Sequence, residues 1–130
     1  MSDACARRDL VRMPSSRFLL WGLPAAVMLL TACFAGGGWI VTIAWTLSLV
    51  VMGAACLVNA RSCGRMHCYF TGPFFLFMAA LSLLHGWRVL SLGSYGWHFI
   101  AAVLLAGGVL LYFVPEWAWG RYRSTQTQVR

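Results

Sequence analysis

Residues 39–58, WIVTIAWTLSLVVMGAACLV, form an unbroken apolar run without a single charged side chain. Because a helix rises about 1.5 Å per residue, such a run can cross a bilayer core about 30 Å thick. The whole chain shares this character: 61% of its 130 residues are hydrophobic and 10% are charged, whereas an ordinary soluble domain has about 25% charged residues. The sequence therefore predicts an integral membrane protein that spans the lipid bilayer.

Three further apolar runs flank this one, at about residues 18–35, 73–92 and 97–114. Glycines 36–38 and the segment 93–96 read as turns, Pro73 suits the first position of a helix, and Pro115 is expected to end the last run. We therefore expect an all-α four-transmembrane-helix bundle with short loops. In this organisation residues 18–115 form the membrane domain, with a Cys/His loop at 59–72, between a basic tail (1–17) and a polar tail (116–130).

The positions of the basic residues orient the bundle. All but one lie in the tail 1–17, the loop 59–72 and the tail 116–130, whereas the connection 36–38 has none and only Arg88 is expected on the other side, near enough to the interface to extend to it. Positively charged connections remain in the cytoplasm, so both termini and the Cys/His loop are predicted to be cytoplasmic in a bacterial inner membrane. The formal charge of +7 comes from arginines at the edges of apolar runs rather than from a patch with interleaved aromatics, which argues against nucleic-acid binding.

Chemically capable side chains crowd around the Cys/His loop. Cys63 and Cys68 are separated by four residues, His67 precedes Cys68, and Cys56 lies seven residues before Cys63. Mixed thiolate and imidazole ligation suits zinc or a softer ion such as Cu(I). We predict a soft-metal site formed by Cys56, Cys63, His67 and Cys68, to which Cys5 of the tail could also contribute. Two alternatives are that the thiols are unliganded and simply packed, and that they exchange disulfides.

Other residues support weaker hypotheses. His85 and His98 are expected in the outer halves of the third and fourth spans, where they could be the axial ligands of a haem b. Leu30-Thr31-Ala32-Cys33 resembles the lipobox of bacterial lipoprotein signals, so lipidation of Cys33 after cleavage is an alternative to a first span. Small residues such as Thr42, Gly53, Gly107 and Gly108 are expected to mark close helix packing.

Three functions follow from these patterns. The leading one is a non-enzymatic membrane protein that binds or passes Hg(II), Cu(I) or Zn(II). The others are an accessory subunit of a larger membrane complex and a haem-bearing electron-transfer subunit. So small a bundle is expected to form a homo-oligomer or join a larger complex. The architecture resembles that of small bacterial mercury-resistance membrane proteins, which also combine cysteines with a few spans, although their cysteine motifs have no counterpart in this chain.

Overall fold

The computed structural model describes residues 14–34 and 38–119, except for the side chains of Cys63 and Trp119. Its elements, in chain order, are α2 (Pro14–Arg17), a π-helical stretch (Phe18–Gly22), α3 (Leu23–Phe34), α4 (Trp39–Cys63), α5 (Met66–Gly86) and α6 (Gly96–Trp119). Four of the resulting segments are long and apolar enough to cross a membrane: Pro14–Phe34, Trp39–Ser62, Met66–Gly86 and Gly96–Ala118. The prediction of an all-α fold with four such helices is confirmed.

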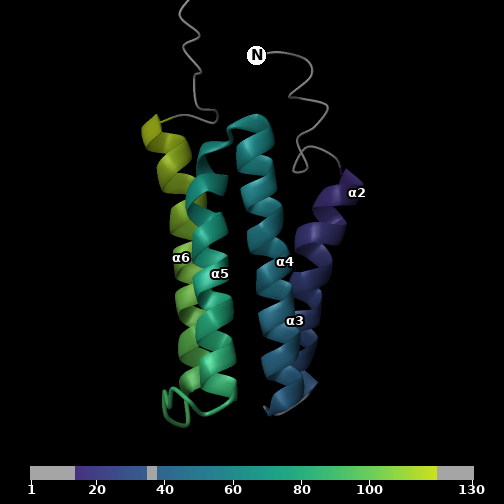
Figure 1. Cartoon of the computed structure of the whole chain (residues 1–130), viewed down its shortest axis with the longest axis vertical. Helices are drawn as coiled ribbons and strands as arrows, with labels where there is room; N and C mark the ends of the chain where they lie inside the picture. The colour runs from purple at the N-terminus through teal and green to yellow at the C-terminus, as the bar shows by residue number, and fades with distance from the viewer. Residues whose placement is uncertain (1–13, 35–37, 120–130) are drawn as a thin grey trace, which may run out of the picture.

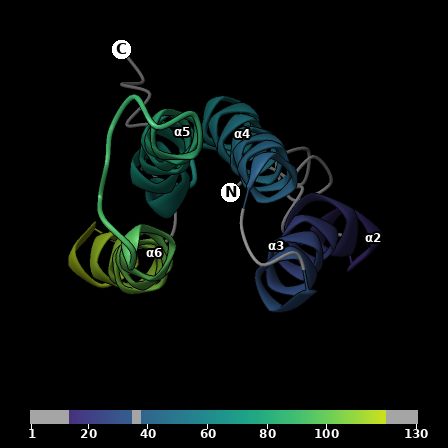
Figure 2. The same cartoon turned by 90° about the horizontal axis from the view of Figure 1, so that it is seen from below.

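The four long helices stand side by side in chain order, as Figure 1 shows. α3 packs on α4, α4 on α5 and α5 on α6, whereas α3 and α6 do not pack on each other within the described residues. Seen along the bundle, the helices form an open arc rather than a closed ring (Figure 2). In their most apolar windows 44% of α4 and of α5 is buried, against 11% of the first segment and 6% of α6. The inner pair therefore carries most of the core.

Glycine allows α4 and α5 to approach closely. A Cβ added at Gly53 would lie 2.9 Å from the Leu76 side chain and 3.1 Å from the Gly72 carbonyl oxygen. One at Gly86 would collide with the fully buried Thr42 side chain. Helices in membranes associate through such small residues, since lipid offers no hydrophobic drive for helix pairing. The expected packing roles of Thr42 and Gly53 are thus confirmed.

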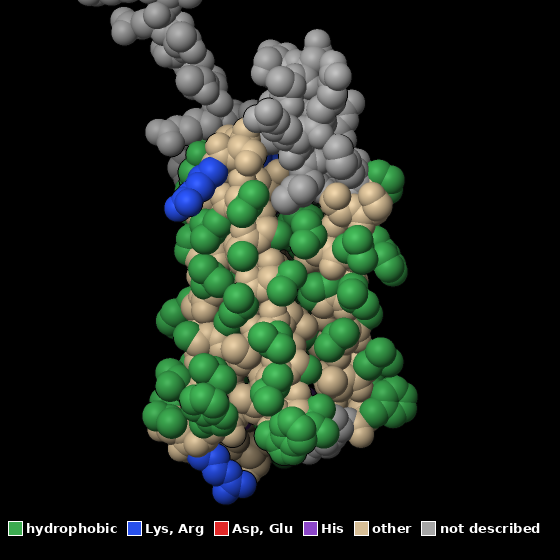
Figure 3. Space-filling view, turned by 45° about the vertical axis from the view of Figure 1, so that its right-hand side comes forward, with side chains coloured by type: hydrophobic (Ala, Val, Ile, Leu, Met, Phe, Trp, Pro, Cys, Tyr) green, Lys and Arg blue, Asp and Glu red, His purple; other side chains and the backbone are tan. Residues whose placement is uncertain are grey.

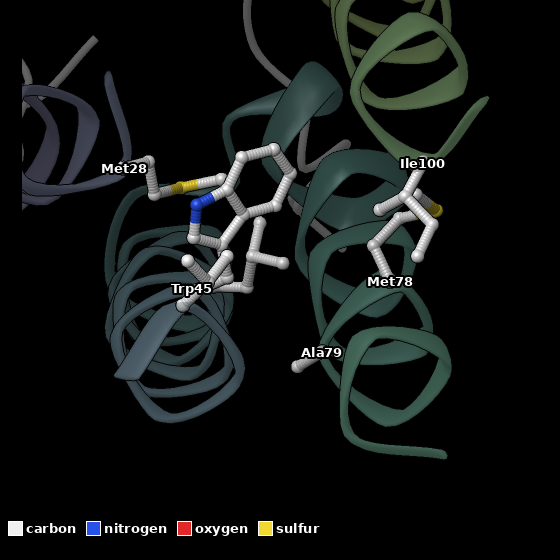
Figure 4. Close-up of a cluster of buried hydrophobic side chains, with 7 residues drawn as sticks. Met28, Trp45, Met78, Ala79 and Ile100 are labelled. Atoms are coloured by element: carbon white, nitrogen blue, oxygen red, sulfur yellow. The ribbon is translucent and has the colours of Figure 1, made fainter. Parts of the chain in front are cut away.

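The main core lies inside the arc. Met28, Trp45, Met78, Ala79 and Ile100 are among its buried members, and Figure 4 shows the Trp45 indole extending from α4 into the space between the helices. The Trp45 ring meets Trp97 of α6 edge to face, with centroids 5.4 Å apart. Since offset and edge-on pairs are favoured by the ring quadrupoles, this contact helps to hold α4 and α6 around the shared core.

Residues 59–72, expected as a loop, are helical apart from a sharp reversal at Gly64 and Arg65. Gly64 adopts a left-handed φ of 63° and donates its N–H to the Ala60 carbonyl at 2.8 Å. This is the usual way a glycine ends a helix, so a single residue suffices to turn the chain. Pro73, expected to begin a helix, lies inside α5. The cost of about 3 kcal/mol for an interior proline is offset by the close packing of α4 and α5.

The other helix ends also differ from expectation. The third helix ends at Gly86 rather than near 92, and α6 continues through Pro115 to Trp119. Near the N-terminus, a π-helical stretch over Phe18–Gly22 ends two residues before Pro24. Such wide turns accommodate a proline that cannot donate to the preceding turn, and this one shapes the segment that carries Trp21.

The surface agrees with a membrane setting. Figure 3 shows hydrophobic side chains scattered along the height of the bundle, with arginine visible on that face only at its two ends. Large apolar side chains such as Phe34, Phe77, Leu105 and Trp117 are mostly exposed. A soluble protein rarely exposes so much contiguous apolar surface, and four apolar helices of this length are compatible with a multi-pass membrane protein.

Candidate functional site

A second, smaller core lies at one end of the bundle, where α2 begins, α4 ends, α5 begins and α6 ends (Figure 1). We refer to this as the Cys/His end. The buried residues are Cys56, Ala60 and Cys68, and the ring of Trp21 packs against them from the π-helical stretch. The π-helical stretch, α4 and α5 thus meet around two cysteine side chains.

The two thiols contact each other. Cys56 is 2% exposed and Cys68 is fully buried, and both side chains belong to this one buried cluster. The Asn59 amide donates to the Cys68 sulfur at 3.6 Å. The Thr71 hydroxyl lies 3.5 Å from the Cys56 sulfur and 2.9 Å from the His67 carbonyl oxygen, and it can donate to either. Each partner lies three residues from a cysteine on its own helix, a spacing that puts both on one helix face.

An imidazole and a carboxylate extend this cluster. His67 Nε2 lies 3.3 Å from the Cys68 sulfur, and its Nδ1 lies 2.6 Å from Glu116 Oε1. A proton on Nδ1 donates to the carboxylate and leaves Nε2 free to accept the Cys68 S–H, because a neutral imidazole carries one donor and one acceptor. The Cys68 thiol, the His67 imidazole and the Glu116 carboxylate therefore contact one another in that order. In enzymes with a nucleophilic cysteine, the same order lets the imidazole remove the thiol proton, and loss of that proton also produces a metal ligand.

The charged side chains Arg65 and Glu116 are paired and largely shielded, whereas Arg17 and Arg61 at the same end are exposed. Arg65 Nε lies 3.6 Å from Glu116 Oε1, and the two side chains are 10% and 15% exposed. The Tyr112 ring covers His67 with centroids 4.7 Å apart. Glu116 therefore has two partners at this end, Arg65 and His67.

A cavity of about 460 Å³ opens beside the thiol pair. Cys56, His67 and Thr71 form its polar wall, and the rest is apolar or aromatic apart from the exposed Arg17. Aromatic lining residues include Trp21 and Tyr112. Cys56 is thus the thiol that a molecule in the cavity would meet first.

The structure brings three of the four predicted ligands together: Cys56, His67 and Cys68. Cys63 is the last residue of α4, but its side chain lies outside the description, as does all of Cys5. Among the side chains that are described, no group of three or more His, Cys, Asp and Glu has the arrangement of a metal site. The described geometry is therefore that of a dithiol with an adjoining imidazole and carboxylate.

Sequence reasoning missed Glu116, Asn59 and Thr71 as members of this cluster. A signal existed for Glu116, since it is the only acidic residue after Asp9 in the chain. Intramembrane or juxtamembrane ionisable groups of this kind usually have a partner. For Asn59 and Thr71 the only signal is their spacing from the two cysteines.

The remaining candidates lie on other helices or at the other end. His85 accepts the Leu92 N–H at 3.4 Å, packs against the Trp97 ring and lines a cavity with Arg88. His98 is exposed, packs against Tyr95 and lines a different cavity. The haem alternative remains a prediction, but the two imidazoles do not share a cavity. Cys33 is exposed in the last turn of α3.

Comparison with known protein families, curated proteins and solved structures gives no match.

Proposed function

We propose that this protein binds a soft metal ion, with Hg(II) or Cu(I) as the best candidates, in a bacterial inner membrane. The observation that supports this proposal is the contact between two buried thiols, Cys56 and Cys68. Thiolate ligands select soft ions. Hg(II) and Cu(I) accept two-coordinate binding, so a dithiol can hold either ion without the further ligands that tetrahedral Zn(II) needs.

The neighbouring groups supply the proton chemistry that such binding needs. A thiol binds a metal as its thiolate, so ion entry releases protons. The Cys56 proton leaves to solvent, while the Cys68 proton can pass to His67 Nε2 at 3.3 Å, where Glu116 at 2.6 Å from Nδ1 stabilises the resulting imidazolium. Metal binding is therefore expected to proceed without leaving a bare charge in the membrane.

Cys63 remains a candidate further ligand or entry thiol, because it ends the helix that carries Cys56. A third thiolate would raise the coordination number of the bound ion and would allow the site to bind Zn(II) as well. Equal Zn(II) affinity in wild type and Cys63→Ser would remove this role, while Hg(II) binding by the inner pair would be unaffected.

The decisive experiment uses the anaerobically purified full chain in detergent. We expect one Hg(II) or Cu(I) per chain to resist a competing thiol in the wild type, and this binding to be lost in Cys56→Ser and in Cys68→Ser. Cys33→Ser is the matched control, since Cys33 is exposed on α3, and it should bind normally. Unchanged stoichiometry in both inner variants would refute the proposal.

The orientation belongs to the same proposal: both termini and the Cys/His end face the cytoplasm. Its support is the arginine bias of the sequence, since connection 36–38 lacks positive charge. In intact cells a membrane-impermeant maleimide should reach Cys33 from the periplasm, and a C-terminal tag should be protected from added protease. Labelling of Cys33 only after cell lysis would reverse the orientation.

A second candidate function is that of an accessory subunit in a larger membrane complex. It is favoured by the low burial of the outer helices, 11% and 6% in their apolar windows, because unused helix faces can pack on a partner. Purification in mild detergent should then yield a stoichiometric partner protein. A stable monomer or homodimer that binds metal would argue against this role.

A further inference from the structure

The cavity beside Cys56 is far larger than a metal ion needs. An ion held between two sulfur atoms replaces thiol protons and occupies almost none of the 460 Å³ beside them. A cavity of about 150 Å³ lined by apolar side chains already accepts benzene. The space next to the thiol pair therefore fits a ligand that joins a thiol-reactive head to an apolar body.

The cavity also extends along the open inner face of the arc. It adjoins a second cavity of about 390 Å³, and the two share Phe75, Gly108 and Val109 in their walls. The Cys56 end offers a thiol, whereas the second cavity is lined almost wholly by apolar side chains, among them the thioethers of Met28 and Met52. The combined space is thus polar and lined by a thiol at one end, and apolar beyond that end.

Gly108 keeps this space open. A Cβ added there would meet no atom within 4 Å, whereas one at the adjacent Gly107 would collide with the Phe74 ring. The expectation that both glycines mark close packing is therefore confirmed for Gly107 and wrong for Gly108. The absence of a side chain at Gly108 leaves room beside Tyr112 and Cys56 that a helix contact does not explain.

We infer that the cavity binds the organic group of a monoorganomercury cation, R–Hg⁺, whose mercury bonds to the Cys56 sulfur. The inference rests on the proposed function and names its substrate class. In the binding step the Cys56 S–H bond breaks, an S–Hg bond forms and the proton leaves to solvent, with no change of oxidation state. The adduct carries no net charge, so the apolar cavity imposes little desolvation cost.

A phospholipid is the competing occupant. Its acyl chains could fill the apolar space and its phosphate could pair with the exposed Arg17. A lipid, however, has no group that uses a thiol, and it would leave the Cys56 and Cys68 pair without a role at the end of the cavity.

The test compares phenylmercury with Hg(II) on the full chain in detergent, each in competition with glutathione. Gly108→Leu is expected to weaken phenylmercury binding about tenfold by filling the cavity, while leaving Hg(II) binding unchanged. Val109→Phe is a second filling variant, and Ala102→Leu, on an exposed part of the same helix, is the matched control. Cys56→Ser should abolish phenylmercury binding.

The possible outcomes distinguish a failure of organomercury binding in the cavity from a failure of Hg(II) binding by the thiols. Equal effects of Gly108→Leu on both mercury species, or no effect on either, would overturn this inference and leave thiol-dependent Hg(II) binding intact. A tightly held phospholipid that phenylmercury does not displace would overturn it as well. Failure of the wild type to bind Hg(II) through its thiols would overturn the proposed function itself.

Discussion

Replacement of Glu116 tests whether the carboxylate and the thiols act as one unit. The Glu116 carboxylate lies 2.6 Å from His67 Nδ1, and His67 Nε2 lies 3.3 Å from the Cys68 sulfur. In the proposed binding step the imidazole takes the Cys68 proton and becomes positive. Glu116→Gln keeps an oxygen that can accept from Nδ1 but removes the negative charge, whereas Glu116→Ala removes both. The two variants should therefore weaken metal binding by different amounts.

The size of each effect follows from the strength of the short contact. A hydrogen bond to a charged group contributes about 1.5–3 kcal/mol, and a neutral one is about half as strong. Since 1.4 kcal/mol corresponds to tenfold in affinity, Glu116→Gln, which loses about half of this energy, should weaken Hg(II) binding about 3- to 10-fold. Glu116→Ala should weaken it about 10- to 100-fold. Both predicted changes refer to Hg(II) affinity measured in competition with a soluble thiol at pH 7.

Proton release gives a readout that loss of packing would not change. Titration of Hg(II) into weakly buffered wild type should release about one proton fewer per ion than titration into Glu116→Ala, because His67 retains the Cys68 proton. Arg61→Gln is the control, since it removes an exposed charge from the same end of the bundle. Identical affinities and identical proton release in all variants would refute the role assigned to Glu116, provided that their metal-free melting temperatures agree.

Two further predictions concern packing and thiol geometry. Gly53→Leu should destabilise the bundle by about 1–3 kcal/mol, because a Cβ at this position would lie 2.9 Å from the α5 side chain it faces. This loss should lower the melting temperature in detergent, whereas the control Gly108→Ala should melt like the wild type. A normal melting temperature for Gly53→Leu would contradict the close packing of α4 and α5. Diamide should link Cys56 to Cys68 within one chain while Cys33 remains free to alkylate, as peptide mass spectrometry would show; recovery of Cys56 and Cys68 as separately alkylated thiols would mean that they do not meet.

The four long helices were predictable because hydropathy and run length are local properties of the sequence. The helical course of residues 59–72 was not, since Arg61 and Arg65 mark a membrane boundary without saying whether the helix stops there. A single left-handed Gly64 reverses the chain, so the basic residues fit into helix ends instead of a loop. Pro73 was misread because an interior proline costs about 3 kcal/mol, and only tertiary packing can offset that cost.

The candidate site was predictable in part for a related reason. Cys56, His67 and Cys68 stood out by residue type, but their contacts depend on the rotation of α4 against α5, which no local pattern specifies. The expectation that Pro115 ends a helix puts Glu116 in the tail 116–130, away from the cysteines. A proline removes only its own N–H, and α6 continues past it to Trp119, which brings the carboxylate to His67.

The contacts of Glu116 distinguish a cluster that can take part in metal binding from a purely structural ion pair. A carboxylate at the end of a membrane helix needs a partner, and Arg65 at 3.6 Å would meet that need alone. The closer contact, at 2.6 Å, is instead with His67, whose other nitrogen faces a buried thiol. That arrangement stabilises positive charge on the imidazole whenever Cys68 gives up its proton. Since a buried thiolate without a counter-charge is costly, the network favours the thiolate at the moment a soft cation arrives to neutralise it.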